Sequence, residues 1–147
     1  MRIMGLDVGE KRIGIAISDE MGWTAQGHSV LIRGKLSEDL AKLDRLCAEY
    51  SIELVVVGFP RNMNGSVGPK GMEIQKFGKV LEQHLSLPVK YWDERLTTVA
   101  AQRVLLEANV SRQKRKKVID MLAAVNILQG YLDRQAAGSL TKDDGKV

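Results

Sequence analysis

The sequence is poor in the residues that build disulfides and zinc sites. It has one cysteine and two histidines in 147 residues. A single cysteine excludes an internal disulfide, and Cys47 lies in an apolar helical pattern, which indicates a buried structural thiol rather than a nucleophile. His28, His84 and Cys47 are far apart in the chain, which argues against a zinc site.

Long apolar runs and aromatic residues are also scarce. No stretch approaches the ~20 apolar residues that cross a bilayer, so we expect no membrane association. An acid at position 7 interrupts the opening apolar run, so we expect no signal peptide. A reducing cytoplasm is the expected location for a chain with a lone thiol. An aromatic content of 5% gives little support for a platform that stacks on bases.

Positive charge is concentrated in one segment. The net charge of the chain is +4. Residues 101–120 hold six basic and two acidic residues, so the net charge of this segment equals that of the whole chain. Its basic residues are Arg103, Arg112, Lys114, Arg115, Lys116 and Lys117. A local basic cluster on a neutral body favours a polyanionic partner. A solvated helix start explains the same residues equally well.

Periodicity predicts one α/β domain. We expect strands at 2–8, 12–18, 28–32, 54–57 and 89–92, and helices at 36–50, 72–85, about 97–108 and about 111–135. Glycine and proline indicate a loop over 59–71. A hairpin followed by alternating strands and helices predicts a mixed five-stranded sheet with helices on both faces. We expect a domain over 1–136 and a flexible tail over 137–147.

Two sets of acids follow predicted strands. Asp7 stands near the end of the first strand, and Asp93 and Glu94 follow the last one. Ligands bind beyond the carboxyl ends of strands in open α/β sheets, so these acids share an edge if the strands are parallel. Asp7 can equally start a turn before Gly9, and the pair can favour a helix dipole. Glu94 is more distinctive, although Asp93 can serve in its place.

Asp120 interrupts an otherwise apolar stretch of the last predicted helix, residues 118–125. We expect that stretch to be buried, and a buried ionised acid needs a cation or a hydrogen-bond donor. An intrahelical ion pair with Lys116 or Lys117 is the structural alternative. Three acids together suit two-metal phosphodiester hydrolysis, which needs hard oxygen ligands. The residues therefore favour Mg²⁺ or Mn²⁺ over zinc.

Four blocks of the sequence resemble the YqgF family, also called RuvX, whose members are ribonuclease H-like relatives of the RuvC Holliday junction resolvases. The blocks are 6–14, 57–68, 93–98 and 114–129, and they occur in the family's order over residues 1 to about 135. The resemblance implies a ribonuclease H-like fold and a catalytic, metal-binding triad of Asp7, Glu94 and Asp120. RuvC itself carries an acid near the end of the strand that corresponds to 54–57, and this sequence has Gly58-Phe59-Pro60 there instead.

The family resemblance also implies a function. It indicates a cytoplasmic nuclease that matures the 5′ end of pre-16S ribosomal RNA, with ribosomal precursor particles as partners. RNA is the favoured nucleic acid, and structured DNA is the alternative, in Holliday junction resolution. A third hypothesis is an RNA-binding assembly factor without catalysis, because fold does not fix function.

Several basic residues are candidates for nucleic-acid binding. Lys11 and Arg12 follow Asp7 across a turn, and Arg95 follows Glu94, so each can contact a phosphate. An exposed turn and a carboxylate pair are the respective alternatives. The cluster Lys114, Arg115, Lys116 and Lys117 suits contact with a phosphate backbone without sequence specificity. The glycine-rich loop 60–69 is a candidate substrate flap, or a plain surface loop.

Overall fold

A computed structural model of the chain describes residues 1–61, 64–94 and 112–140. Their strands are β1 (Arg2–Val8), β2 (Arg12–Ser18), β3 (Ala25–Ile32), β4 (Ile52–Phe59) and β5 (Val89–Asp93). Their helices are α1 (Leu36–Tyr50), α2 (Pro69–Leu85) and α4 (Arg112–Leu140). The helix expected over about 97–108 lies outside the described residues.

The five strands form one mixed sheet in the order β3-β2-β1-β4-β5. β1 pairs antiparallel with β2, and β2 with β3, whereas β1, β4 and β5 run parallel. The hairpin requires only a short turn, while each parallel connection passes through a helix. The predicted mixed sheet is therefore confirmed, and the carboxyl ends of β1, β4 and β5 meet at one edge.

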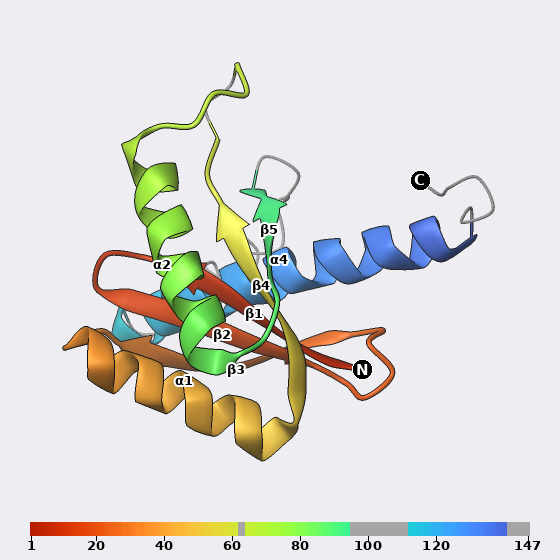
Figure 1. Cartoon of the computed structure of the whole chain (residues 1–147), viewed down its shortest axis with the longest axis horizontal. Helices are drawn as coiled ribbons and strands as arrows, with labels where there is room; N and C mark the ends of the chain where they lie inside the picture. Colours follow the sequence, from red (N-terminus) through yellow and green to blue (C-terminus); the bar gives the residue numbers. More distant parts are fainter. Residues whose placement is uncertain (62–63, 95–111, 141–147) are drawn as a thin grey trace.

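Helices cover both faces of this sheet (Figure 1). Alternate residues of β1 separate two cores: Met4, Leu6 and Val8 pack with α1 and α2, and Ile3 packs with α4. β4 alternates in the same way, and its Val55 and Val57 lie in the core beneath α1 and α2. Several strand positions on the α4 side carry glycine. A Cβ on Gly5 would lie 2.7 Å from the Cβ of Leu128, so α4 packs unusually close to β1.

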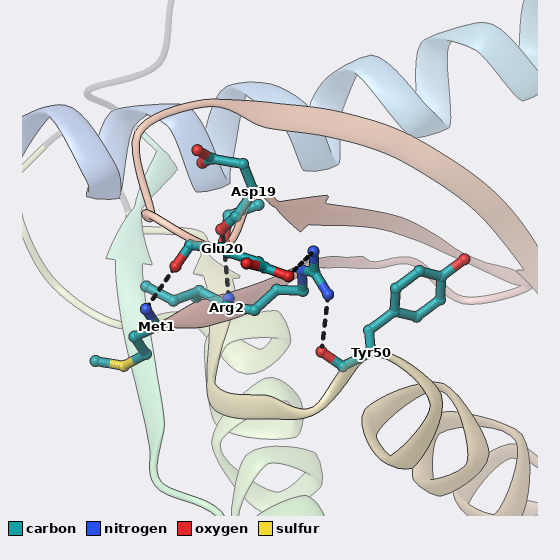
Figure 2. Close-up of polar contacts among 7 residues, drawn as sticks. Met1, Arg2, Asp19, Glu20 and Tyr50 are labelled. Atoms are coloured by element: carbon teal, nitrogen blue, oxygen red, sulfur yellow. Dashed lines mark hydrogen bonds and ion pairs between the residues drawn. The ribbon is translucent and has the colours of Figure 1, made fainter.

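Polar contacts join elements at the opposite end of the sheet (Figure 2). The amino group of Met1 donates to the carbonyl oxygen of Glu20 over 2.6 Å. The guanidinium of Arg2 lies 3.6 Å from the Glu20 carboxylate and donates to the Tyr50 carbonyl oxygen over 3.4 Å. These bonds tie the start of β1 to the β2–β3 turn and to the end of α1.

Some element boundaries differ from the sequence-based predictions. α2 begins at Pro69 instead of residue 72, because proline is well suited to the first helical position. α4 continues to Leu140, five residues past the expected end. β3 begins at Ala25 because it pairs along its length with β2. Cys47 is buried, as expected, and its burial raises the pKa of the thiol to about 11.

None of the helices described here is both long and apolar enough to cross a membrane.

Candidate active site

Two acids lie at the shared carboxyl edge of the parallel strands. Asp7 is the penultimate residue of β1, and Glu94 directly follows β5. Leu6 pairs with Val57 in β4, and Gly58 pairs with Trp92 in β5. Because the three strands are parallel and adjacent, the register brings Asp7 and Glu94 to the same edge, as predicted. Asp7 alternates with Leu6 and Val8 and therefore faces α4.

Two glycines leave space for Asp120 and Glu94. Gly14 pairs with Asp7 across β1 and β2, and a Cβ on it would collide with the backbone carbonyl oxygen of Asp120. A Cβ on Gly58 would collide with the Ile127 side chain and lie 3.3 Å from the Glu94 carboxyl carbon. β4, which carries Gly58 and no acid at this end, therefore leaves the space that Glu94 occupies.

Electrostatics show that these acids affect one another. Burial raises the pKa of Asp7, and the Asp120 carboxylate raises it further. Burial also raises the pKa of Glu94, and the Asp7 carboxylate adds to that rise, with a smaller contribution from Asp93. Carboxylates that share a half-buried site repel when ionised. Asp7 is thus coupled electrostatically to both Asp120 and Glu94.

Asp120 has a partner that the sequence did not predict. Its Oδ2 lies 3.2 Å from Nε of Arg12 in β2, not beside the exposed Lys117. The same oxygen is buried and has no hydrogen bond of good geometry. The stretch 118–125, expected to be buried, is only partly so, because Ala124 is fully buried and the other seven residues are half-buried. The side chain of Asp120 is 23% exposed, while its backbone packs closely against Gly14.

Lys70 is the second cation of the site. It stands in the first turn of α2 and lowers the pKa of both Asp7 and Glu94, which places its charge within reach of both. The sequence contained a usable signal, because Gly68-Pro69 marks a helix start and helix starts after β4 lie at the carboxyl edge. Sequence reasoning treated this segment only as part of a loop.

The donor set fits a hard divalent cation. Asp7, Glu94 and Asp120 offer carboxylate oxygens, which Mg²⁺ and Mn²⁺ prefer. Burial and neighbouring carboxylates raise the pKa of Asp7 and of Glu94, so a bound cation would stabilise their charged forms. Among the described residues, no three His, Cys, Asp or Glu side chains form a closed cluster around one position. Asp120 is instead paired with Arg12.

The other predicted contact residues divide into three groups. Lys11 is exposed at the tip of the β1–β2 hairpin, next to Arg12 at the site. Lys117 is exposed on α4, one turn before Asp120. Arg95 lies outside the described residues, and so do the side chains of Lys114, Arg115 and Lys116, although their backbone belongs to α4.

The sheet order and the helices on both faces define a ribonuclease H-like fold. Solved structures with this arrangement include Thermus thermophilus RuvC in complex with a Holliday junction substrate. That chain matches with a TM-score of 0.55 and 15% identity over 92% of this chain and 96% of its own. The fowlpox virus resolvase in complex with Holliday junction DNA matches with a TM-score of 0.56 and 16% identity, over 92% and 99%. These likenesses establish the fold.

The chain belongs to the RuvX family, described as Holliday junction resolvase, whose pattern matches residues 1–134. A Syntrophomonas wolfei protein is 59% identical over 143 residues, which cover 97% of this chain and 99% of that protein. A Bacillus subtilis protein is 58% identical over 135 residues, covering 90% and 98%. Both carry the name "Putative pre-16S rRNA nuclease". The predicted family is therefore confirmed.

Proposed function

We propose that this chain is a metal-dependent nuclease that hydrolyses nucleic acid phosphodiesters, acting in 5′-end maturation of pre-16S ribosomal RNA. The observation that carries the proposal is that Asp7 and Glu94 share one sheet edge while α4 brings Asp120 over Gly14, the residue paired with Asp7. The charges of Asp120 and Asp7 also raise the pKa of Asp7 and of Glu94, respectively. The names of relatives with more than half of their residues identical support the RNA substrate. The acting partners would be precursor RNA or the ribosomal precursor particle, in the cytoplasm.

Asp7, Glu94 and Asp120 would hold Mg²⁺ or Mn²⁺. Such ions, when bound, lower the pKa of water and stabilise the charge that develops on the leaving oxygen. The chain itself supplies the positions of the acids. Asp7 lies within β1, Glu94 directly follows β5, and Asp120 lies on a helix packed against Gly14, so regular elements position the acids.

Cationic side chains would orient the substrate. Arg12 lies beside Asp120 and can bind a phosphate once a metal ion takes over its carboxylate partner. Lys11, next to Arg12, and Lys117, one turn before Asp120, are exposed and can contact a phosphate backbone. Arg95, Lys114, Arg115 and Lys116 would extend that contact by charge. Contacts of this kind position a nucleic acid but do not read its bases.

The test is cleavage of a 5′-extended 16S precursor RNA with Mg²⁺ or Mn²⁺. Wild type is expected to shorten the 5′ end, and Asp7→Asn and Asp120→Asn are expected to lose the activity. Asp133→Asn is a matched control, because Asp133 is exposed on the same helix as Asp120 and bonds only with Gln129 among the contacts described. Full activity in Asp7→Asn would refute the proposal.

Cleavage of a four-way DNA junction is the second candidate, favoured by the description of the family whose pattern matches residues 1–134. A junction incubated beside the precursor RNA under the same conditions decides between them. Symmetric cleavage of a junction requires a dimer, so a strictly monomeric chain that leaves the junction intact excludes this candidate. Salt-dependent RNA binding without turnover in either metal would instead indicate a non-catalytic assembly factor.

A further inference from the structure

A groove lies on the side of the sheet edge opposite Asp120. It has a volume of about 490 Å³ and is lined by Val8, Gly9 and Glu10, which directly follow Asp7. Its other walls are Arg33 after β3 and the first turns of α2 with Lys70. Asp7 therefore stands between the groove and the face that α4 covers. A nucleic acid strand that crosses the edge at Asp7 would enter this groove.

Arg33 is a fixed cation in the groove. Its Nη1 donates to the carbonyl oxygen of Gly9 over 2.6 Å, and its Cζ lies 5.2 Å from the centre of the Phe77 ring. Its backbone N–H also donates to the carbonyl oxygen of Lys11 over 2.9 Å. A carbonyl and a ring hold the guanidinium in place without neutralising it. Its remaining N–H groups form a fork suited to two oxygens of one anion.

Lys70 supplies the second charge. Of the described residues, none places a carboxylate within 4.0 Å of the charged nitrogens of Arg33 or Lys70, since the ion pairs found there are Arg2–Glu20 and Arg12–Asp120. Lys70 also lowers the pKa of Asp7 and of Glu94 without an ion pair to either, and it lines the groove beside Val8 and Gly9, which follow Asp7. The two cations thus line one groove, which begins directly after Asp7.

Resting on the proposed nuclease function, we propose that this groove binds a phosphate of the substrate strand adjacent to the one cleaved, with Arg33 and Lys70 as its contacts. Arg33 would bind two phosphate oxygens through its fixed guanidinium, and Lys70 would contact the same group as a point charge. The contact would hold the strand in register over the acids. It would thereby position the scissile phosphate without taking part in the chemistry.

Glu10 and Glu73 also line the groove, so its formal charge is balanced. Net attraction therefore does not recruit the phosphate, and the interaction depends on direct contact with the two cations. Two substitutions in the groove should consequently change the affinity for RNA differently. Lys70→Gln removes a contact and weakens binding, whereas Glu73→Gln removes a repulsive charge and leaves binding equal or tighter. A groove that takes a cation or a polar base would give the reverse order.

The test measures binding of a single-stranded RNA that spans the precursor cleavage site, by fluorescence anisotropy with chelator present. Without metal ions no cleavage occurs, so binding is measured independently of the nuclease function. Lys70→Gln is expected to weaken binding about 10-fold, the scale of one charge-assisted hydrogen bond. It should also reduce the slope of log K against log salt by about 0.7–0.9. Arg33→Gln should act similarly, with Arg33→Lys as the version that keeps the charge.

Lys79→Gln is the matched control. It removes the same charge from the same helix, at an exposed position nine residues on, about 13 Å along the axis. The RNA affinity of Lys79→Gln should stay within about twofold of the wild-type affinity, as expected for a surface charge outside the contact. Equal effects of Lys70→Gln and Lys79→Gln would overturn the proposal, because only general charge would then matter.

A second measurement locates the phosphate. RNAs that carry one neutral methylphosphonate each, at successive linkages, remove one phosphate charge at a time. One linkage beside the cleavage site is expected to weaken binding to wild type more than binding to Lys70→Gln, which keeps only the Arg33 contact; a smaller effect in the variant shows that both changes act on the same contact. Absence of any such linkage refutes the proposal even if the enzyme cleaves RNA. Conversely, this coupling in a chain that never cleaves would support the groove and refute the nuclease function.

Discussion

Replacement of Gly14 by alanine tests whether the packing of α4 on β2 sets the active site. A Cβ at this position would collide with the carbonyl oxygen of Asp120 and lie 2.7 Å from its carbonyl carbon. Carbon atoms prefer a separation of about 3.5–4.0 Å, so α4 must move away from β2 by about 1 Å. The obstacle is helix backbone, which cannot turn aside as a flexible side chain would.

The expected losses differ for stability and activity. Overpacking of this kind costs about 1–3 kcal/mol. For a chain of this size that lowers the midpoint of thermal unfolding by about 2–12 °C. A misplacement of about 1 Å at a catalytic group costs about 100-fold in rate. Gly14→Ala should therefore remain folded at moderate temperature but lose most of its cleavage activity.

Urea unfolding and precursor cleavage, measured on the same preparation, provide the test. Gly27→Ala is the matched control, because Gly27 in β3 also faces α4. Its Cβ would lie 3.4 Å from the Met121 Cβ and 3.6 Å from Val125 Cγ2. These are ordinary contacts, so we expect wild-type activity and stability there. Wild-type activity in Gly14→Ala would show that the Asp120 position does not depend on helix packing.

Three further predictions concern the charges and the thiol. Asp7 and Glu94 have raised pKa values, so the folded chain binds more protons than the unfolded chain between the ordinary values, 3.8 and 4.5, and the folded ones. The free energy of unfolding without metal should therefore fall as pH rises through that window. Asp7→Asn should melt above wild type near pH 7 and equal to it in acid; an unchanged melting profile would contradict the coupling. Arg12→Gln should bind Mg²⁺ about fivefold more tightly in calorimetric titration, because a competing cation worth about 1 kcal/mol is removed; weaker binding would show that Arg12 supports the metal site. Folded Cys47, with its pKa at about 11, should react with iodoacetamide about 100-fold more slowly at mildly alkaline pH than in the urea-unfolded chain; equal rates would mean that the thiol is accessible.

The sequence predicted the architecture well because its strands have strong local signals. The alternation in β2 and the short apolar run of β4 each indicated the correct element, and the order of elements indicated a mixed sheet. The parallel pairing of β1, β4 and β5 then followed from the helices between them. That pairing was enough to bring Asp7 and Glu94 to one edge. The preference for Glu94 over Asp93, in contrast, rests on the family resemblance and stays a prediction, because the two acids are adjacent in sequence.

Contacts between distant segments were not predictable in the same way. The pair of Arg12 and Asp120 joins residues more than a hundred positions apart, and no local pattern indicates it. Arg33 resembled an ordinary loop residue until the Phe77 ring and the Gly9 carbonyl were found on either side of it. Lys70 lies in the segment 59–71, which the sequence indicated as a loop. Each depends on which helix covers which part of the sheet, which is tertiary information.

The glycines on the α4 face have a consequence for how this protein can change. Glycine inside a strand lowers stability by about 0.5–1 kcal/mol relative to alanine, so replacing it is an obvious route to a hardier protein. At Gly14 and Gly58 that route is closed, because any side chain would displace the Asp120 backbone or the space used by Glu94. Thermal adaptation of this scaffold must therefore proceed elsewhere, for example in the core beneath α1 and α2. Stabilising substitutions on the α4 face should separate sharply into tolerated ones, as at Gly27, and inactivating ones.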